Sequence, residues 1–176
     1  EPEGALVLAG RCYEREAVPY KAFDGVVDRL GQHLEKLPST ERATLLSPSA
    51  GLLAQVFPVL QGIVPLAAEV RVDPQELRRR VFDELRELLA RLGARCRLVL
   101  AIDDLQWVDR DSLALLQALF AQPGAPRLLV VATLRSGEHP TLEQDLGVHC
   151  CLRRLELPPL LPPEARALAA WFLRGT

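Results

Sequence analysis

The sequence lacks the features of a membrane, secreted or strongly charged protein. None of its apolar runs is long enough to cross a bilayer, and the first residues do not combine a basic stretch with an apolar one, as a secretion signal would. The formal net charge of −2 leaves no broad basic surface for nucleic acid. We therefore expect a cytoplasmic protein that neither enters a membrane nor binds nucleic acid directly.

Metal-binding and redox patterns are also absent. The four cysteines include no C-x-x-C pair, and Cys150 and Cys151 are neighbours, which rarely form a disulfide with each other. The three histidines show no ligand spacing. We expect reduced thiols that pack as small apolar side chains, and we predict neither a zinc site nor a redox site.

Methionine is missing altogether, and lysine occurs only at positions 21 and 36. Because the sequence has no methionine and starts at Glu1, we expect a fragment of a longer protein. The bias towards arginine, leucine, alanine and proline fits a GC-rich bacterial genome. The length of 176 residues corresponds to one domain or most of one.

What the sequence does contain is an alternation of apolar strands and amphipathic helices. Strands are predicted over residues 4–12, 98–102, 127–133 and 150–157. Helices are predicted to start at Pro19, at residues 38–41, at Asp73-Pro74, at Asp109 or Asp111, and at residue 162, with Gly93 as the C′ residue of the third. This alternation predicts an α/β fold, in which a parallel sheet carries helices on both faces and forms three layers.

Two adjacent carboxylates, Asp103 and Asp104, follow the apolar strand 98–102 directly. Arg135 follows the next strand, 127–133. In an open parallel sheet, ligands bind outside the carboxyl ends of the strands. Two carboxylates and one guanidinium in one crevice suit a magnesium-phosphate ligand, since Mg²⁺ takes carboxylate and phosphate oxygens and arginine pairs with phosphate.

Simpler roles compete with this interpretation. Asp103 and Asp104 could form a plain turn after the strand, with Asp104 capping a helix, and Arg135 could be a structural ion-pair partner as readily as a phosphate reader. Arg11, Glu14 and Glu16 are expected to be surface or structural residues. A receiver domain is rejected because no later strand ends in a phosphorylatable aspartate. A Toprim-type nuclease is rejected because its acids are spaced differently.

The segment L-V-L-A-I-D-D-L-Q-W resembles the Walker B strand of the STAND branch of AAA-like P-loop NTPases. The resemblance implies that Asp103 holds Mg²⁺ and that Asp104 orients or deprotonates the water that attacks the γ-phosphate of ATP. The strand ending in T-L-R is similar to the following sensor strand, in which a polar residue reads the γ-phosphate. Thr133 and Arg135 are the matching positions.

The segment G-R-C-Y-E-R-E-A-V-P-Y-K-A-F, residues 10–23, resembles ATPase modules attached to bacterial Ser/Thr protein kinases, adenylyl cyclases and LuxR-type regulators. Residues 155–168 resemble the strand that leads into the helical lid. We expect a partial NTPase core over residues 1–160 and the start of the lid over residues 161–176. The phosphate-binding loop G-x-x-x-x-G-K-[ST] is absent. Its strand normally lies between the 127–133 and 150–157 strands, so we expect a gap, a swapped partner strand or a shifted last strand.

These resemblances predict part of an ATP-binding and ATP-hydrolysing regulatory module in a bacterial signalling protein, with a fused Ser/Thr protein kinase as the first choice of output domain. ATP and Mg²⁺ are the expected cofactors of the intact protein, and self-association is left open. The chain alone is expected to bind ATP weakly or not at all, because the missing loop supplies most of the grip on the phosphates. The rival hypothesis is a degenerate interaction scaffold that kept the fold and lost turnover.

Overall fold

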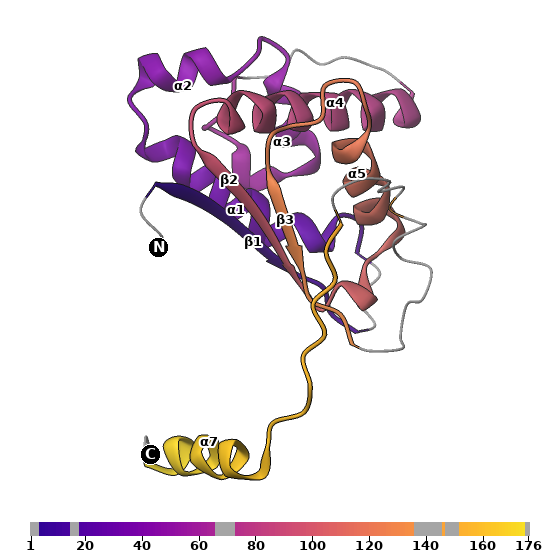
Figure 1. Ribbon diagram of the computed structural model, residues 1–176. Coiled ribbons are helices and arrows are strands. Elements are labelled where there is room, and N and C mark those ends of the chain that lie inside the picture. Colours follow the sequence, from indigo (N-terminus) through magenta and orange to yellow (C-terminus); the bar gives the residue numbers. More distant parts are fainter. Residues whose placement is uncertain (1–3, 15–17, 66–72, 136–145, 147–151, 175–176) are drawn as a thin grey trace.

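Three strands form one parallel sheet in the computed structural model, which describes residues 4–14, 18–65, 73–135, 146 and 152–174 (Figure 1). The strands pair in the order β1 (Ala5–Arg11), β2 (Arg97–Asp103) and β3 (Leu129–Ala132), and both pairs are parallel. The register aligns the carboxyl ends, with Arg11 opposite Asp103 and Ile102 opposite Ala132. The α/β class and the parallel sheet predicted from the sequence are confirmed.

The helices begin where the sequence offers helix-starting residues. The α-helices are α1 (Lys21–Lys36), α2 (Ser39–Leu45), α3 (Leu53–Val56), α4 (Pro74–Gly93), α5 (Arg110–Phe120) and α7 (Pro162–Arg174), and the 3₁₀ turns are η1 (Ala50–Leu52), η2 (Pro58–Leu60) and η3 (Leu105–Trp107). Helix α4 starts as predicted, because the Asp73 side chain accepts a hydrogen bond from the Gln75 amide and proline occupies the first helical position. Of the two predicted caps for α5, the structure selects Asp109.

Two glycines allow backbones to pack closely against the helices. A Cβ atom on Gly10 would lie 2.0 Å from the Ala22 carbonyl oxygen, so this glycine lets α1 lie directly on β1. The prediction that Gly93 is a C′ residue is wrong, since Gly93 is the last residue of α4 and Ala94 follows it in the right-handed helical region. A Cβ atom on Gly93 would lie 2.4 Å from the Arg127 carbonyl oxygen. Close approach of the chain before β3, rather than a left-handed turn, requires this glycine.

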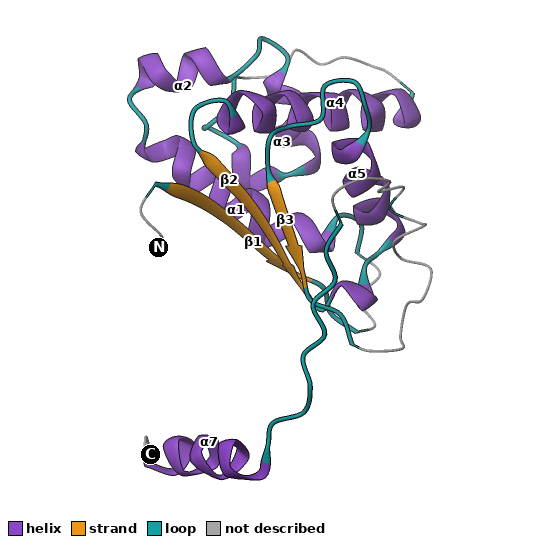
Figure 2. Cartoon of the chain, viewed as in Figure 1, coloured by secondary structure: helices purple, strands orange, loops and turns teal. Residues whose placement is uncertain are grey.

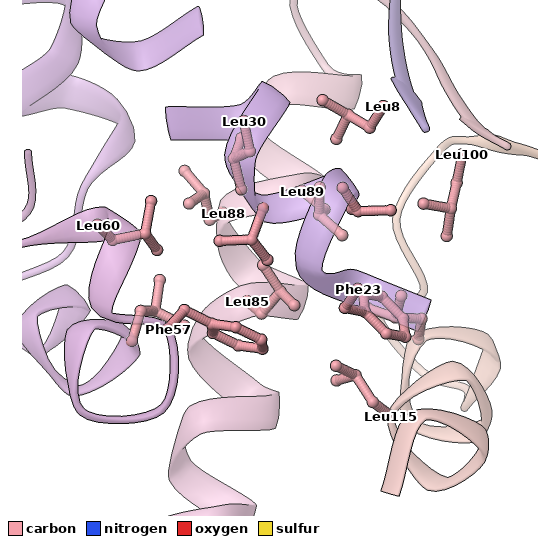
Figure 3. Close-up of a cluster of buried hydrophobic side chains, with 14 of the residues drawn as sticks. Leu8, Phe23, Leu30, Phe57, Leu60, Leu85, Leu88, Leu89, Leu100 and Leu115 are labelled. Atoms are coloured by element: carbon pink, nitrogen blue, oxygen red, sulfur yellow. The ribbon is translucent and has the colours of Figure 1, made fainter. Parts of the chain in front are cut away.

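The apolar core lies between the sheet and the helices. Leu8 and Leu100 point from one face of the sheet towards α1, α4 and α5, where they meet a layer of leucine and phenylalanine side chains (Figure 3). The side chains of this layer that are labelled in Figure 3 are buried, and they include Phe23, Leu30, Phe57, Leu85, Leu88, Leu89 and Leu115. Each side chain of this size stabilises the fold by about 1.5–3 kcal/mol when buried. This core holds the strand ends in place.

The opposite face of the sheet carries no helix from the described part of the chain. Figure 2 shows the strands uncovered on that side, and the side chains there are exposed or half-buried rather than buried. Leu129 and Val131 of β3 are 60% and 47% exposed. Among the described residues, β3 also pairs with β2 alone. The described residues therefore form two of the three predicted layers, and they leave one face and one edge of the sheet open.

The prediction of a fourth strand over residues 150–157 is wrong for the residues that can be assessed. Residues 152–161 are irregular and exposed, and Cys150 and Cys151 lie outside the described residues. The physical reason is that no strand in the described part of the chain lies beside this segment to pair with it, which agrees with the expected gap next to β3. Helix α7 follows, apart from the sheet, with Trp171 and Phe172 exposed (Figure 1). No described helix has both the length and the apolarity needed to cross a membrane.

Candidate functional site

The carboxyl ends of the three strands bring together the side chains that the sequence singled out. Asp103 ends β2 and Asp104 follows it, while Thr133 and Arg135 follow β3. The ladder between β2 and β3 continues beyond the strands, because the Thr133 amide donates to the Ile102 carbonyl and the Leu105 amide donates to the Thr133 carbonyl. Thr133 is thereby fixed beside the two aspartates. The structure therefore brings Asp103, Asp104 and Thr133 together at this edge of the sheet, with the segment that carries Arg135 beside them.

Asp103 is half-exposed and has a neighbour at each of its two carboxylate oxygens. Its side chain is 52% exposed. Oδ1 accepts a hydrogen bond from the Thr133 hydroxyl at 2.5 Å, and Oδ2 lies 3.6 Å from Arg11 Nε. A half-exposed carboxylate held by one hydroxyl and one long ion pair can coordinate a cation once the arginine side chain moves, without a large rearrangement of the backbone.

Asp104 is held by four hydrogen bonds in an uncommon backbone conformation. Its φ of 54° lies in the left-handed region, which aspartate tolerates better than most residues. Its amide donates to Thr133 Oγ1 at 2.9 Å, and its Oδ1 accepts from Gln106 Nε2 at 3.0 Å. Its Oδ2 accepts from Arg11, at 2.8 Å from Nη2 and 3.2 Å from Nε. The side chain makes no capping bond to η3, so the alternative role of Asp104 as a helix cap does not describe it.

The charges around Asp104 keep it ionised. Hydrogen bonds from Arg11 and then from Gln106 lower the pKa of Asp104, and the positive charge of Arg135 acts in the same direction. The site thus contains a carboxylate that stays charged well below neutral pH. A carboxylate of this kind accepts hydrogen bonds from a water molecule and orients it, which is one of the two roles implied for Asp104.

Gln106 connects the aspartate pair to the segment after β3. This side chain is only 4% exposed. Its Nε2 donates to Asp104, and its Oε1 accepts from the backbone amide of Arg135 at 3.3 Å. Both ends of the amide are therefore used, and Gln106 fixes the spacing between Asp104 and the chain that carries Arg135.

Asp109 ties the loop after β1 to the loop after β2. Its carboxylate accepts from the amides of Tyr20 and Lys21, both at 3.1 Å, and it also caps α5 through Asp111 and Ser112. Tyr20 has a φ of 64°, which is rare for a bulky residue. Partial burial alone raises the pKa of Asp109, but the hydrogen bonds donated to it outweigh burial, and its pKa lies below the usual value.

Two residues of this site were not predicted to act in it. Arg11 was expected to be a surface or structural residue, yet its guanidinium contacts both aspartates. Gln106 was noted only as part of a motif. Arg11 could have been found from the sequence, because it ends the first strand as Asp103 ends the second, and the ends of adjacent parallel strands meet. Glu16 lies outside the described residues.

The donor chemistry fits a magnesium ion bound together with phosphate. Mg²⁺ in nucleotide sites is held by one or two carboxylates, water and phosphate oxygens, and Asp103 and Asp104 supply that number of carboxylates. Within the described ranges, no group of three or more histidine, cysteine, aspartate and glutamate side chains could hold a metal by itself. The site therefore fits a cation that the two carboxylates hold together with water or phosphate oxygens.

Comparison with known proteins places the chain in a family. The family model for an AAA ATPase domain matches residues 1–131, which include β1, β2, the first three residues of β3 and the aspartate pair. Searches of the curated proteins and of the solved structures return no match. The matched segment covers most of the 176 residues. The chain therefore belongs to the AAA ATPase domain family.

Proposed function

We propose that this chain is the Walker B and sensor half of a STAND-type ATPase module, which binds and hydrolyses ATP in the intact protein. The observation that carries the proposal is the convergence of Asp103, Asp104, Thr133 and Arg135 at one edge of the sheet, with Asp103 directed to solvent. Family membership supports an ATPase-type module in general. The STAND branch and the individual residue roles are our proposals.

Each residue has one role in the proposed site. Asp103 would hold Mg²⁺, and the Thr133 hydroxyl would keep that carboxylate in position through its hydrogen bond to Oδ1. Asp104 would orient the water that attacks the γ-phosphate, and Arg135 would contact the γ-phosphate. The cation, when bound, would neutralise charge on the triphosphate. Gln106 would keep Asp104 and the Arg135 segment at a fixed distance.

The open face and edge of the sheet support the idea that a phosphate-binding loop completes the module. Parallel sheets are almost always covered on both faces. No described strand pairs with the outer edge of β3, where Leu129 and Val131 are exposed, so this edge offers a place for another strand. The face that no described helix covers offers a place for a helix. Residues 1–160 would then be the core and residues 161–176 the start of a helical lid, as the sequence suggests.

The isolated chain tests whether nucleotide affinity depends on a phosphate-binding loop that this chain lacks. Isothermal titration with Mg-ATP should give no micromolar binding, because the backbone amides and the lysine of a phosphate-binding loop supply most of the affinity. Micromolar binding would contradict the proposal. In the protein that includes the neighbouring upstream sequence, Mg-ATP should bind, and Asp103→Asn should weaken that binding while Asp111→Asn should not.

The wider setting is proposed from the resemblance of residues 10–23. We place the module in the cytoplasm, in a multidomain bacterial signalling protein, fused to a Ser/Thr protein kinase or another signalling domain whose activity it would regulate. The second candidate is a scaffold that binds a partner and does not turn over ATP. The exposed apolar side chains on β3 and α7 favour it. A glycine-rich loop ending in Lys-Ser or Lys-Thr upstream of Glu1 would decide for the ATPase, and its absence would decide for the scaffold.

A further inference from the structure

Arg11 is a charged side chain of the site to which the proposed ATPase chemistry gives no role. It ends β1, and its guanidinium approaches the aspartate pair from the side opposite β3. The four carboxylate oxygens divide into two kinds. Both Oδ1 atoms are held by neutral donors, the Thr133 hydroxyl and the Gln106 amide. Both Oδ2 atoms face Arg11, at 3.6 Å in Asp103 and 2.8 Å in Asp104.

We infer that Arg11 is an internal counter-ion, which occupies the two Oδ2 atoms of the aspartate pair until a divalent cation takes its place. The inference rests on the proposed function, because that function makes Asp103 the metal ligand. The Oδ1 atoms are already used by groups that hold the loop together. A cation that binds the pair must therefore compete with the guanidinium for the Oδ2 atoms. Arg11 is thus a positioning residue that lowers the affinity of the aspartate pair for the cation.

Arg11 is also placed so that it can move away. Its side chain is 55% exposed, and ion pairs at this level of exposure contribute little stability, so a divalent cation can replace them. The guanidinium already lies over the Tyr13 ring, with Cζ 5.6 Å from the ring centroid, and this contact can hold the side chain when it leaves the carboxylates. Displacement of Arg11 therefore requires a side-chain rotation and no change in the sheet.

A purely structural ion pair makes different predictions from an internal counter-ion. If Arg11 only stabilises the fold, its removal lowers stability and leaves the response to Mg²⁺ unchanged. If Arg11 competes with the cation, its removal makes the aspartate pair respond at lower Mg²⁺ concentration. The Gln106 side-chain amide is a direct probe, because its Nε2 donates to Asp104 and its resonance shifts when the carboxylate is engaged.

The experiment is a Mg²⁺ titration of this chain, followed by the Gln106 side-chain resonances in ¹H–¹⁵N spectra. Arg11→Gln should reach its midpoint at about fivefold lower Mg²⁺ than the unchanged chain, as expected when an exposed ion pair no longer competes. Arg11→Lys keeps the charge and loses the two-donor fork, so its midpoint should lie between the two. Arg29→Gln is the matched control, because Arg29 is exposed in the groove beside Arg11 and makes no contact with the aspartates among the described interactions.

Equal midpoints in Arg11→Gln and Arg29→Gln would overturn the inference, and so would the absence of any response of Gln106 in all four proteins. Either result can be told apart from failure of the proposed function. Binding of Mg-ATP by the protein with its upstream sequence, and its loss in Asp103→Asn, tests that function without reference to Arg11.

Discussion

Replacement of Asp109 by alanine should destabilise this chain more than the loss of an ordinary helix cap. The carboxylate accepts backbone hydrogen bonds from Asp111 and Ser112 of α5 and from Tyr20 and Lys21 at the start of α1. Loss of an aspartate cap costs about 1 kcal/mol. Each further backbone donor left without its acceptor adds about 1 kcal/mol, reduced where water can replace it. We therefore expect Asp109→Ala to lower the free energy of unfolding by about 2–3 kcal/mol.

The matched control is Asp73→Ala. Asp73 caps α4 in the same way but accepts one backbone hydrogen bond, from Gln75. Its loss should cost about 1 kcal/mol. Urea unfolding followed by circular dichroism measures the free energy of unfolding of both variants and of the unchanged chain. The slope of this free energy against urea concentration, the m-value, should be the same in all three. If Asp109→Ala costs no more free energy than Asp73→Ala, the hydrogen bonds from the Tyr20 and Lys21 amides to Asp109 contribute no stability. That result would contradict the role of Asp109 in joining the two loops.

The same side chain should make stability depend on acid. Because the pKa of Asp109 is lower in the folded chain than its usual value, its contribution is complete above the unfolded value near pH 4. The contribution is lost as the pH falls through the folded value. Unfolding free energies measured from neutral to acid pH should therefore fall less steeply in Asp109→Ala than in the unchanged chain. Parallel curves would show that Asp109 has the same pKa in both states.

Two further predictions concern buried groups beside the aspartate pair. Gln106→Leu should lower the free energy of unfolding by about 1–3 kcal/mol, because it leaves the Arg135 amide and one oxygen of Asp104 without their partner. Urea unfolding measures this loss. A loss no larger than that of an ordinary surface substitution would contradict the prediction. Burial, with a smaller effect from the nearby aspartates, raises the pKa of Cys12 to about 12. Iodoacetamide at pH 8 should therefore leave Cys12 unmodified in the folded chain and alkylate it in urea, as read by peptide mass spectrometry; equal labelling in both states would contradict the burial.

Much of the fold could be predicted because local patterns and packing agree. The apolar run into Asp103 predicted β2, and the Asp73-Pro74 start predicted α4. The predicted strand over 150–157 shows where local pattern fails, since residues 152–157 contain three leucines among charged residues and remain irregular. A strand exists only when a neighbouring strand pairs with it, and no described strand pairs with this segment.

The site was predicted in part for the same reason. Asp103, Asp104, Thr133 and Arg135 follow predicted strands, so their meeting could be inferred from parallel pairing alone. The hydrogen bonds of Gln106 could not, because they depend on the left-handed conformation of Asp104, which turns the chain after β2. The same holds for Asp109, whose double role requires the Tyr20 loop to lie against the start of α5.

The most direct test of the central claim is Mg²⁺-dependent binding and hydrolysis of ATP by the protein that carries this chain together with its upstream sequence. We predict that Asp103→Asn weakens Mg-ATP binding, and that Asp104→Asn still binds Mg-ATP but hydrolyses it at least about a hundredfold more slowly, the usual range for loss of a group that positions the attacking water. The control variant Asp111→Asn should behave as the unchanged protein. Unchanged binding in Asp103→Asn and unchanged hydrolysis in Asp104→Asn would contradict the assignment of the aspartate pair.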